Sequence, residues 1–129
     1  MESANYKTLP SWTYSNETFF ELEKRELFLN SWQLICHSSN IPLAGDYFTF
    51  DLFNERLVAV RDEGMEIRVF HNVCSHRATK LFDCVSGNCG KRIVCPYHAW
   101  SYDLSGNLKY VPGCDDSEDL DIKNHGFRV

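Results

Sequence analysis

The hydrophobic and polar positions divide this chain into an N-terminal helical stretch and a longer stretch of short β-like runs. Phe20, Leu27 and Phe28 recur at helical spacing and form one apolar stripe. Asn16 precedes them as a suitable N-cap, and the glutamates that follow it complement the helix dipole. The pattern predicts an amphipathic helix over 17–31.

Beyond Trp32 the apolar residues cluster in short runs rich in Val, Ile, Phe and Tyr, which are typical of β-strands. Residues such as Gly45, Gly64 and Gly106 lie between these runs, where they favour tight turns. Many short strands joined by turns predict a mainly β fold built from antiparallel sheets. The predicted strands cover 33–37, 46–52, 56–61, 66–71, 92–95, 99–104 and 108–111.

Length and charge narrow the class of protein. A chain of 129 residues is long enough to bury a core as one domain. The net charge of −5 disfavours nucleic-acid binding, which needs a basic surface. No apolar run approaches the roughly 18 residues of a membrane span, and the N-terminus lacks a secretory signal. We therefore expect a cytoplasmic protein that binds neither membrane nor nucleic acid.

The six cysteines could form disulfides or bind a metal. Without an export signal the metal interpretation is favoured, because cytosolic thiols stay reduced. We expect Cys36 to be a small buried hydrophobic residue and Cys114 to be inert in an acidic tail, whose residues 115–121 form a solvated loop. Cys84 and Cys89 are interpreted as unpaired surface-loop thiols, with a disulfide across the short turn between them as the alternative.

Two short motifs carry the chemistry: Cys74-Ser75-His76 and Cys95-Pro96-Tyr97-His98, separated by 18 residues. Two cysteines and two histidines could hold a tetrahedral zinc ion or a [2Fe–2S] cluster. Zinc sites usually pair Cys with Cys and His with His, two to four residues apart. One Cys-x-His and one Cys-x-x-His instead favour a Rieske cluster, in which one iron has two cysteine ligands and the other two histidines.

The ligand charges predict the electronic behaviour of such a cluster. Two ferric ions, two sulfides, two thiolates and two neutral imidazoles sum to zero, whereas four thiolates would give −2. The neutral form accepts an electron more readily, so the reduction potential falls within about −150 to +300 mV. We expect His76 and His98 to lie near solvent and to form the path for electrons.

The stretch CSHRATKLFDCVSGNCGKRIVCPYHAWSYDLSGNL resembles the Rieske segment of the α subunits of ring-hydroxylating and related Rieske non-haem iron oxygenases. The resemblance extends over about residues 18–113. It implies an antiparallel Rieske domain over 39–129 with the cluster on two loops, incomplete at its C-terminus, after an N-terminal extension with a helix over 1–38. It also implies electrons from a ferredoxin or flavin reductase, spent on aromatic-ring hydroxylation or small-amine oxidation.

Differences from the cytochrome bc-type Rieske proteins point to the low end of the potential range. Thr79 and Tyr97 occupy the positions of the disulfide between their two cluster loops, and Trp100 replaces a serine that donates to a sulfide. Ala99 stands where the family commonly has glycine, so we expect no positive φ there. Arg77, Pro96, Tyr97 and Trp100 are the expected neighbours of the ligands.

The oxygenase resemblance also implies a mononuclear Fe(II) held by two histidines and a carboxylate, in a catalytic domain of the same or a neighbouring subunit of a homotrimer. The remaining histidines, His37, His71 and His125, show no such motif. We therefore expect this chain to be the electron-transfer part only. A free-standing Rieske ferredoxin is the alternative, although the N-terminal helix favours the oxygenase, and a zinc-binding module is the third interpretation.

Overall fold

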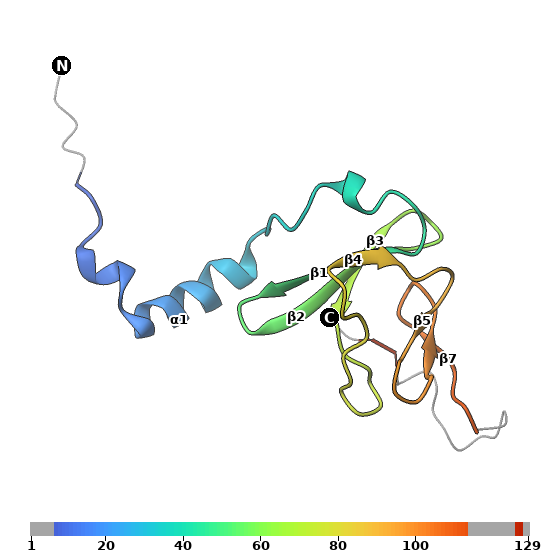
Figure 1. Ribbon diagram of the computed structural model, residues 1–129. Coiled ribbons are helices and arrows are strands. Elements are labelled where there is room, and N and C mark those ends of the chain that lie inside the picture. The colour runs from blue at the N-terminus through green and yellow to red at the C-terminus, as the bar shows by residue number, and fades with distance from the viewer. Residues whose placement is uncertain (1–6, 114–125, 128–129) are drawn as a thin grey trace. The chain divides into compact units, whose positions relative to one another are not determined.

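The computed structural model describes residues 7–113 and 126–127. The chain forms two compact units, 1–35 and 36–129, and Figure 1 shows the helix in the first and the strands in the second. The functional division into 1–38 and 39–129 stays a prediction. None of the helices in the described residues is long and apolar enough to cross a membrane.

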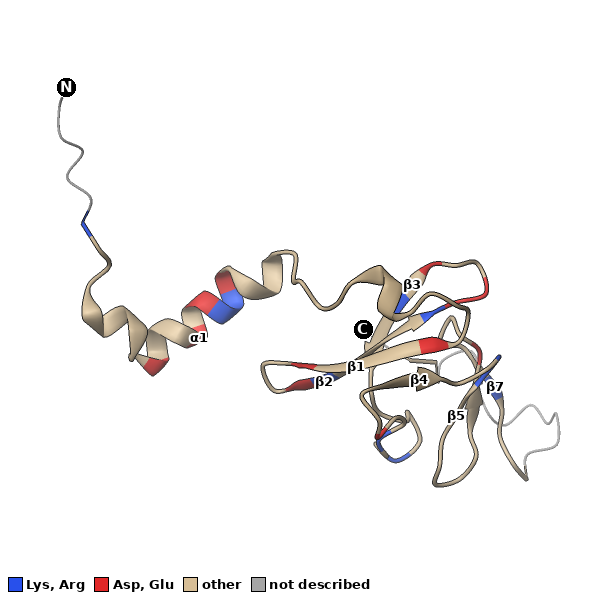
Figure 2. Cartoon of the chain, turned by 45° about the horizontal axis from the view of Figure 1, so that its top comes forward, with Lys and Arg blue, Asp and Glu red and all other residues tan. Residues whose placement is uncertain are grey.

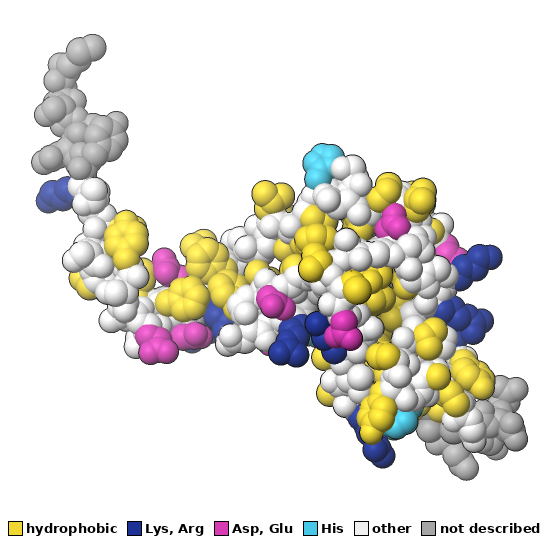
Figure 3. All heavy atoms as spheres, viewed as in Figure 1, with side chains coloured by type: hydrophobic (Ala, Val, Ile, Leu, Met, Phe, Trp, Pro, Cys, Tyr) yellow, Lys and Arg dark blue, Asp and Glu magenta, His cyan; other side chains and the backbone are white. Residues whose placement is uncertain are grey.

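The first unit contains α1 (Glu17–Glu26), preceded by the short 3-10 helix η1 (Ser11–Tyr14). The Asn16 side chain accepts a hydrogen bond from the Phe19 amide at 2.8 Å, as a helix N-cap does. Hydrophobic residues of this unit lie on its surface in Figure 3, and Trp12, Leu22 and Leu29 are all exposed.

The predicted helix over 17–31 is too long at its C-terminal end. After Glu26 the chain tightens into η2 (Phe28–Asn30). Polar side chains compete for the carbonyl oxygens there, since Asn30 donates to Arg25 O at 2.8 Å and Ser31 donates to Leu27 O at 2.6 Å. Such local side-chain bonds are a recognised alternative to helix continuation.

The predicted strand over 33–37 is wrong. This segment is irregular and leads into η3 (Ser38–Asn40), where His37 Nδ1 accepts from the Ser39 amide. The Gln33 side chain turns back and donates to Phe28 O at 2.8 Å. Cys36 is only half-buried, contrary to expectation, because it lies on this irregular segment and not in a sheet.

The larger sheet has the order β3-β2-β1-β4, with antiparallel neighbours. Val58 and Val60 of β2 point into the core, and Val58 pairs with Phe70 of β3. The short β4 was not predicted, because its sequence Ser-Gly-Asn has no apolar pattern. The strands are β1 (Asp46–Leu52), β2 (Glu55–Arg61), β3 (Ile67–His71) and β4 (Ser86–Asn88).

Ion pairing stabilises the turn between β2 and β3. Figure 2 shows acidic and basic residues together there. Asp62 is buried and accepts from Arg68 Nε at 3.0 Å and from the Glu66 amide at 2.8 Å. The Arg68 hydrogen bond is the main reason why the pKa of Asp62 lies below its usual value.

The smaller sheet has the order β5-β6-β7 and is also antiparallel. Its strands are shorter than predicted: β5 (Ile93–Val94), β6 (Ser101–Tyr102) and β7 (Leu108–Tyr110). Strand β6 ends where the Asp103 side chain accepts hydrogen bonds from the Ser105 and Asn107 amides and so closes a turn.

A hydrophobic cluster joins the two sheets, and it is formed by buried residues of the described part of the chain. It contains Val58, Val60 and Phe70 from the larger sheet and Ile93, Tyr102 and Leu108 from the smaller one, together with Cys74, Cys95 and Trp100. The two cysteines of the predicted site therefore belong to the core, so folding of the sheets fixes their positions.

Asn72 clamps the chain on either side of the first cysteine motif. Asn72 is buried. Its side-chain Nδ2 donates to Phe82 O at 2.8 Å, and its side-chain Oδ1 accepts from the Phe82 amide at 2.9 Å. The side chain thus imitates a strand partner for Phe82 and fixes both ends of the segment between them.

We predict that Asn72→Ala destabilises the fold by about 2–3 kcal/mol, because both buried polar groups of Phe82 lose their partner. Urea unfolding followed by circular dichroism measures this difference. Asn40→Ala, the same change at an exposed position, is the control and should cost less than about 0.5 kcal/mol. Equal effects of the two substitutions would contradict the clamp.

Candidate functional site

The two cysteine motifs lie on two loops, and each loop is closed by its own pair of backbone hydrogen bonds at equivalent positions. In the first loop the Cys74 amide donates to Thr79 O at 2.7 Å, and the Ala78 amide donates to Cys74 O at 2.9 Å. In the second loop the Cys95 amide donates to Trp100 O at 2.8 Å, and the Ala99 amide donates to Cys95 O at 3.0 Å. Each loop therefore begins at a cysteine and returns five residues later.

Both loops contain an alanine in the left-handed conformation. Ala78 has a φ of 52° and Ala99 a φ of 56°. The expectation that Ala99 avoids a positive φ is wrong, because the loop closes only when the fourth residue after the cysteine turns this way. A left-handed alanine costs roughly 1–2 kcal/mol, which the two closing hydrogen bonds and the buried cysteine offset.

The loops bring the two cysteines together inside the core. Cys74 and Cys95 are each only 2% exposed. Burial raises the pKa of the Cys74 thiol, and the neighbouring Cys95 raises it further, whereas a hydrogen bond from Tyr102 lowers it. Two adjacent buried sulfurs of this kind become stable thiolates only beside a positive charge.

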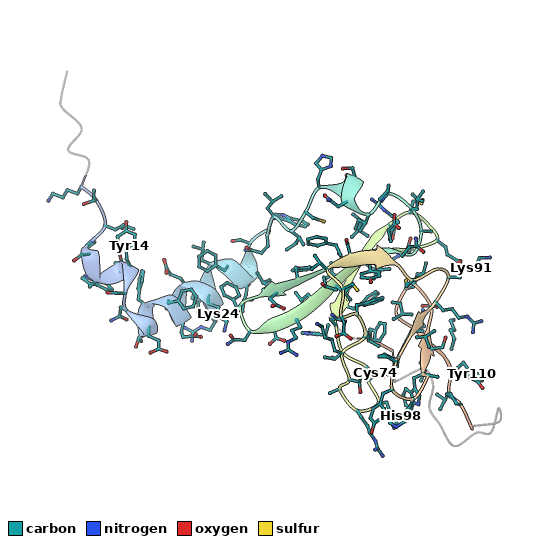
Figure 4. All side chains as sticks on the ribbon, viewed as in Figure 1. Tyr14, Lys24, Cys74, Lys91, His98 and Tyr110 are labelled. Atoms are coloured by element: carbon teal, nitrogen blue, oxygen red, sulfur yellow. The ribbon has the colours of Figure 1, made fainter. Side chains whose placement is uncertain are left out.

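The histidines of the two motifs lie next to each other and are more exposed than the cysteines. Their ring centroids are 4.8 Å apart with planes at 62°, and both rings are partly exposed. Figure 4 shows Cys74 and His98 at the same end of the second unit. The site thus has a sulfur pair inside and an imidazole pair outside.

His76 has a ring nitrogen suited to metal binding. Its Nδ1 is buried and has no hydrogen-bond partner, which is rare and costly for a polar atom in a folded protein. Burial is the main cause of its lowered pKa, and His98 and Arg77 lower it further. The ring is therefore neutral with a lone pair available, and a metal ion at Nδ1 would satisfy it.

Two aromatic rings hold the histidines. Trp100 is buried and stacks on His76, with ring centroids 4.5 Å apart and planes within 6°. Tyr97 stacks on His98 at 3.7 Å while remaining 61% exposed, so it covers that ring from the solvent side. Of the other expected neighbours, Pro96 and Arg77 are both exposed on the loops.

The hydrogen bonds of Tyr102 were not predicted from the sequence, where an aromatic residue at this position is explained either by exclusion of water from the site or by core packing. The Tyr102 hydroxyl lies 3.1 Å from Cys74 Sγ and 2.9 Å from Ser75 Oγ. Burial raises its pKa, so the hydroxyl stays protonated, and its one O–H can donate to one of these two atoms while it accepts from the other. Its position two residues after Trp100 was the available signal, because alternate residues of an extended segment face the same side.

The four donors do not surround one point. Within 7–113 and 126–127, no group of three or more Cys, His, Asp or Glu side chains could hold a single metal ion. The arrangement of a cysteine pair and a histidine pair fits two adjacent metal ions better than one tetrahedral zinc ion.

The remaining cysteines stand apart from this site. All five cysteines in the described part of the chain are free thiols, and Cys114 and the acidic stretch 115–121 lie outside it. A Cys84–Cys89 disulfide is ruled out, because β4 extends between them at about 3.3 Å per residue. Cys89 is not a surface-loop thiol: it packs against the core and donates to Gly45 O at 3.2 Å.

Comparison with known proteins decides the family. The family model described as "Rieske [2Fe-2S] domain" matches residues 31–124. The chain belongs to the Rieske [2Fe–2S] domain family. The cofactor of this family is a [2Fe–2S] cluster, which agrees with the cysteine pair and histidine pair that the two loops bring together.

The Rieske domain is similar to the N-terminal part of oxygenase α subunits. The carnitine monooxygenase oxygenase subunit of Escherichia coli is 38% identical over 88% of this chain and 30% of its own length. The biphenyl 2,3-dioxygenase α subunit of Rhodococcus jostii is 40% identical over 77% of this chain and 21% of its own. This chain spans about a third of the carnitine monooxygenase subunit.

Solved structures confirm the mainly antiparallel fold. A quaternary ammonium Rieske monooxygenase, CntA, superposes with a TM-score of 0.84 at 36% identity, over 93% of this chain and 33% of its own. A naphthalene 1,2-dioxygenase gives 0.79 at 34% identity, over 89% of this chain and 26% of its own.

We predict that Tyr102→Phe lowers the reduction potential of the Rieske domain while its visible spectrum persists. A hydroxyl that donates to a ligand sulfur favours the reduced, more negative state, and about 1 kcal/mol of preference corresponds to roughly 40 mV. A spectroscopic redox titration measures the change. Ser101→Ala, the neighbouring buried hydroxyl, is the control, and an equal shift in both variants would refute this role for Tyr102.

We also predict opposite effects of two substitutions at Ala99. Ala99→Gly should stabilise the Rieske domain by up to about 1 kcal/mol, and Ala99→Val should destabilise it by about 2 kcal/mol, because a β-branched residue is strained at positive φ. Ala44→Gly, at an exposed position without positive φ, should be slightly destabilising. Denaturant unfolding distinguishes these outcomes, and destabilisation by Ala99→Gly would be inconsistent with the left-handed turn.

Proposed function

We propose that Cys74 and Cys95 hold one iron of the [2Fe–2S] cluster, that His76 and His98 hold the other, and that the domain accepts electrons within an oxygenase α subunit. The partnerless Nδ1 of His76, beside His98 and above two buried cysteines, carries the assignment. When bound, the cluster supplies one-electron transfer at a potential set by its ligands.

The residues around the donors tune and protect the site. The core positions of Cys74 and Cys95 keep water away from the sulfurs. Trp100 and Tyr97 hold the imidazole rings by stacking, which limits their reorientation when the charge of the site changes. These contacts supply the preorganisation that rapid electron transfer requires.

The partly exposed histidine pair marks where electrons pass. A donor protein would meet the surface formed by the two loop tips, where Arg77, Pro96 and Tyr97 are exposed. We propose that a ferredoxin or flavin reductase supplies the electrons. They pass to a mononuclear iron in a catalytic domain of the same or a neighbouring subunit, within a homotrimer in the cytoplasm.

For the whole protein we propose oxidation of a quaternary ammonium compound. Oxygenase subunits of carnitine and glycine betaine monooxygenases are similar over 88% and 94% of this chain, respectively. Hydroxylation of an aromatic ring is the second candidate, because the biphenyl dioxygenase subunit is 40% identical over a shorter stretch. Turnover of carnitine, glycine betaine and biphenyl by the full-length protein with its reductase discriminates between the two.

We predict that the purified chain is red-brown, contains two irons, and loses its visible bands with dithionite. Cys74→Ala and Cys95→Ala should each abolish the bands, because one iron would lose a thiolate. Cys84→Ala removes an exposed thiol outside the site and should leave the iron content unchanged. A colourless protein with stoichiometric zinc would overturn the proposal.

We predict that His98→Cys lowers the reduction potential of any cluster that assembles. A thiolate adds a negative charge where the imidazole is neutral, so the reduced state becomes less favourable. Redox titration followed by electron paramagnetic resonance measures the potential, with His71→Cys as a control outside the proposed ligand set. An unchanged potential would show that His98 is not a ligand.

A further inference from the structure

Phe127 lies against the hydrogen-bonded tyrosine of the site although it is remote from it in the chain. Its ring stacks on that of Tyr102, with centroids 4.0 Å apart and planes at 29°. It also contacts Phe70 of β3 at 5.3 Å. Phe127 therefore touches one residue from each sheet.

The position of Phe127 is fixed by its backbone as well as by its ring. Its amide donates to Gly106 O at 2.8 Å. Gly106 has a φ of +87°, and a Cβ there would lie 2.7 Å from the Phe70 ring and 3.3 Å from Phe127 Cβ. Because glycine has no Cβ, position 106 leaves space for the side chains of Phe70 and Phe127 to contact each other.

Tyr102 lies on the middle strand of the smaller sheet, where it pairs with Ile93 and Leu108. Strand β6 contains only two residues, and its register with β7 shifts between Ser101 and Tyr102. Yet the Tyr102 hydroxyl must stay within hydrogen-bonding distance of Cys74 Sγ. Because the hydroxyl is at the far end of the ring, a tilt of the ring displaces the hydroxyl more than it displaces the backbone, so the contacts on the ring face determine where the hydroxyl lies.

We propose that Phe127 is a positioning residue that holds the Tyr102 ring so that its hydroxyl donates to Cys74. The inference rests on the proposed function, because it concerns the sulfur that Cys74 gives to the cluster. Phe127 acts on the reduction potential through Tyr102, whose ring it contacts directly. Phe127 thereby takes part in setting the redox properties of the site.

The test compares reduction potentials of the wild type, Phe127→Ala, Tyr102→Phe and the double variant. A hydrogen bond worth about 0.5–1.5 kcal/mol corresponds to a roughly two- to tenfold change in the ratio of reduced to oxidised protein at fixed potential. We expect Phe127→Ala to shift this ratio towards the oxidised form. In the Tyr102→Phe background the same substitution should have no further effect, because the hydroxyl is already absent.

Two further variants separate positioning from general packing. Val60→Ala removes buried volume from β2 in the same core and should reduce stability without moving the potential. Phe127→Leu retains apolar bulk and should give a smaller shift than alanine. Electron–nuclear double resonance on the reduced protein should show an exchangeable proton near the cluster that is lost in Tyr102→Phe and altered in Phe127→Ala.

The outcomes distinguish this inference from the proposed function. A wild-type protein without a [2Fe–2S] spectrum would overturn both. A normal wild type with an unchanged potential in Phe127→Ala, or an equal shift in both backgrounds, would overturn only the role of Phe127. If Phe127→Ala fails to assemble a cluster, Phe127→Leu decides, and a wild-type potential in that variant would overturn the inference.

Discussion

The burial of two sulfurs between the sheets is the constraint on which the rest of the site depends. Cys74 and Cys95 occupy positions that ordinary apolar residues could fill, and burial raises the pKa of the Cys74 thiol. A pair of thiolates is sustained there only by positive charge and by donors such as the Tyr102 hydroxyl. In the proposed assignment, the two irons would supply the positive charge that the buried sulfurs need, and the outer histidines would complete the coordination without adding charge.

The asymmetry of the site arises inside two loops of the same construction. Each loop begins at a cysteine and is closed by equivalent backbone bonds, with a left-handed alanine four residues on. The histidine is the second residue after the cysteine in one loop and the third in the other. Two loops of similar backbone conformation therefore place their imidazole rings next to each other near the surface, while their cysteine sulfurs are buried in the core.

The sequence predicted the parts that local chemistry determines. The ligand spacing indicated the cluster, and runs rich in Val, Ile, Phe and Tyr between turn residues indicated β1, β2 and β3. Prediction failed where distant residues decide the outcome. The strand β4 is polar and exists because β1 offers it an edge. The positive φ of Ala99 follows from loop closure, and the bond from Tyr102 to Cys74 joins residues 28 positions apart.

Packing and electronic tuning share the same residues. Tyr102 is completely buried between the sheets and its hydroxyl lies 3.1 Å from Cys74 Sγ, and Trp100 is both a core residue and the stacking partner of His76. A core substitution that moves either ring must therefore alter the surroundings of the donors, even when stability is largely retained. Phe127 joins Phe70 of one sheet to Tyr102 of the other, so this contact between the sheets is also a contact on the Tyr102 ring.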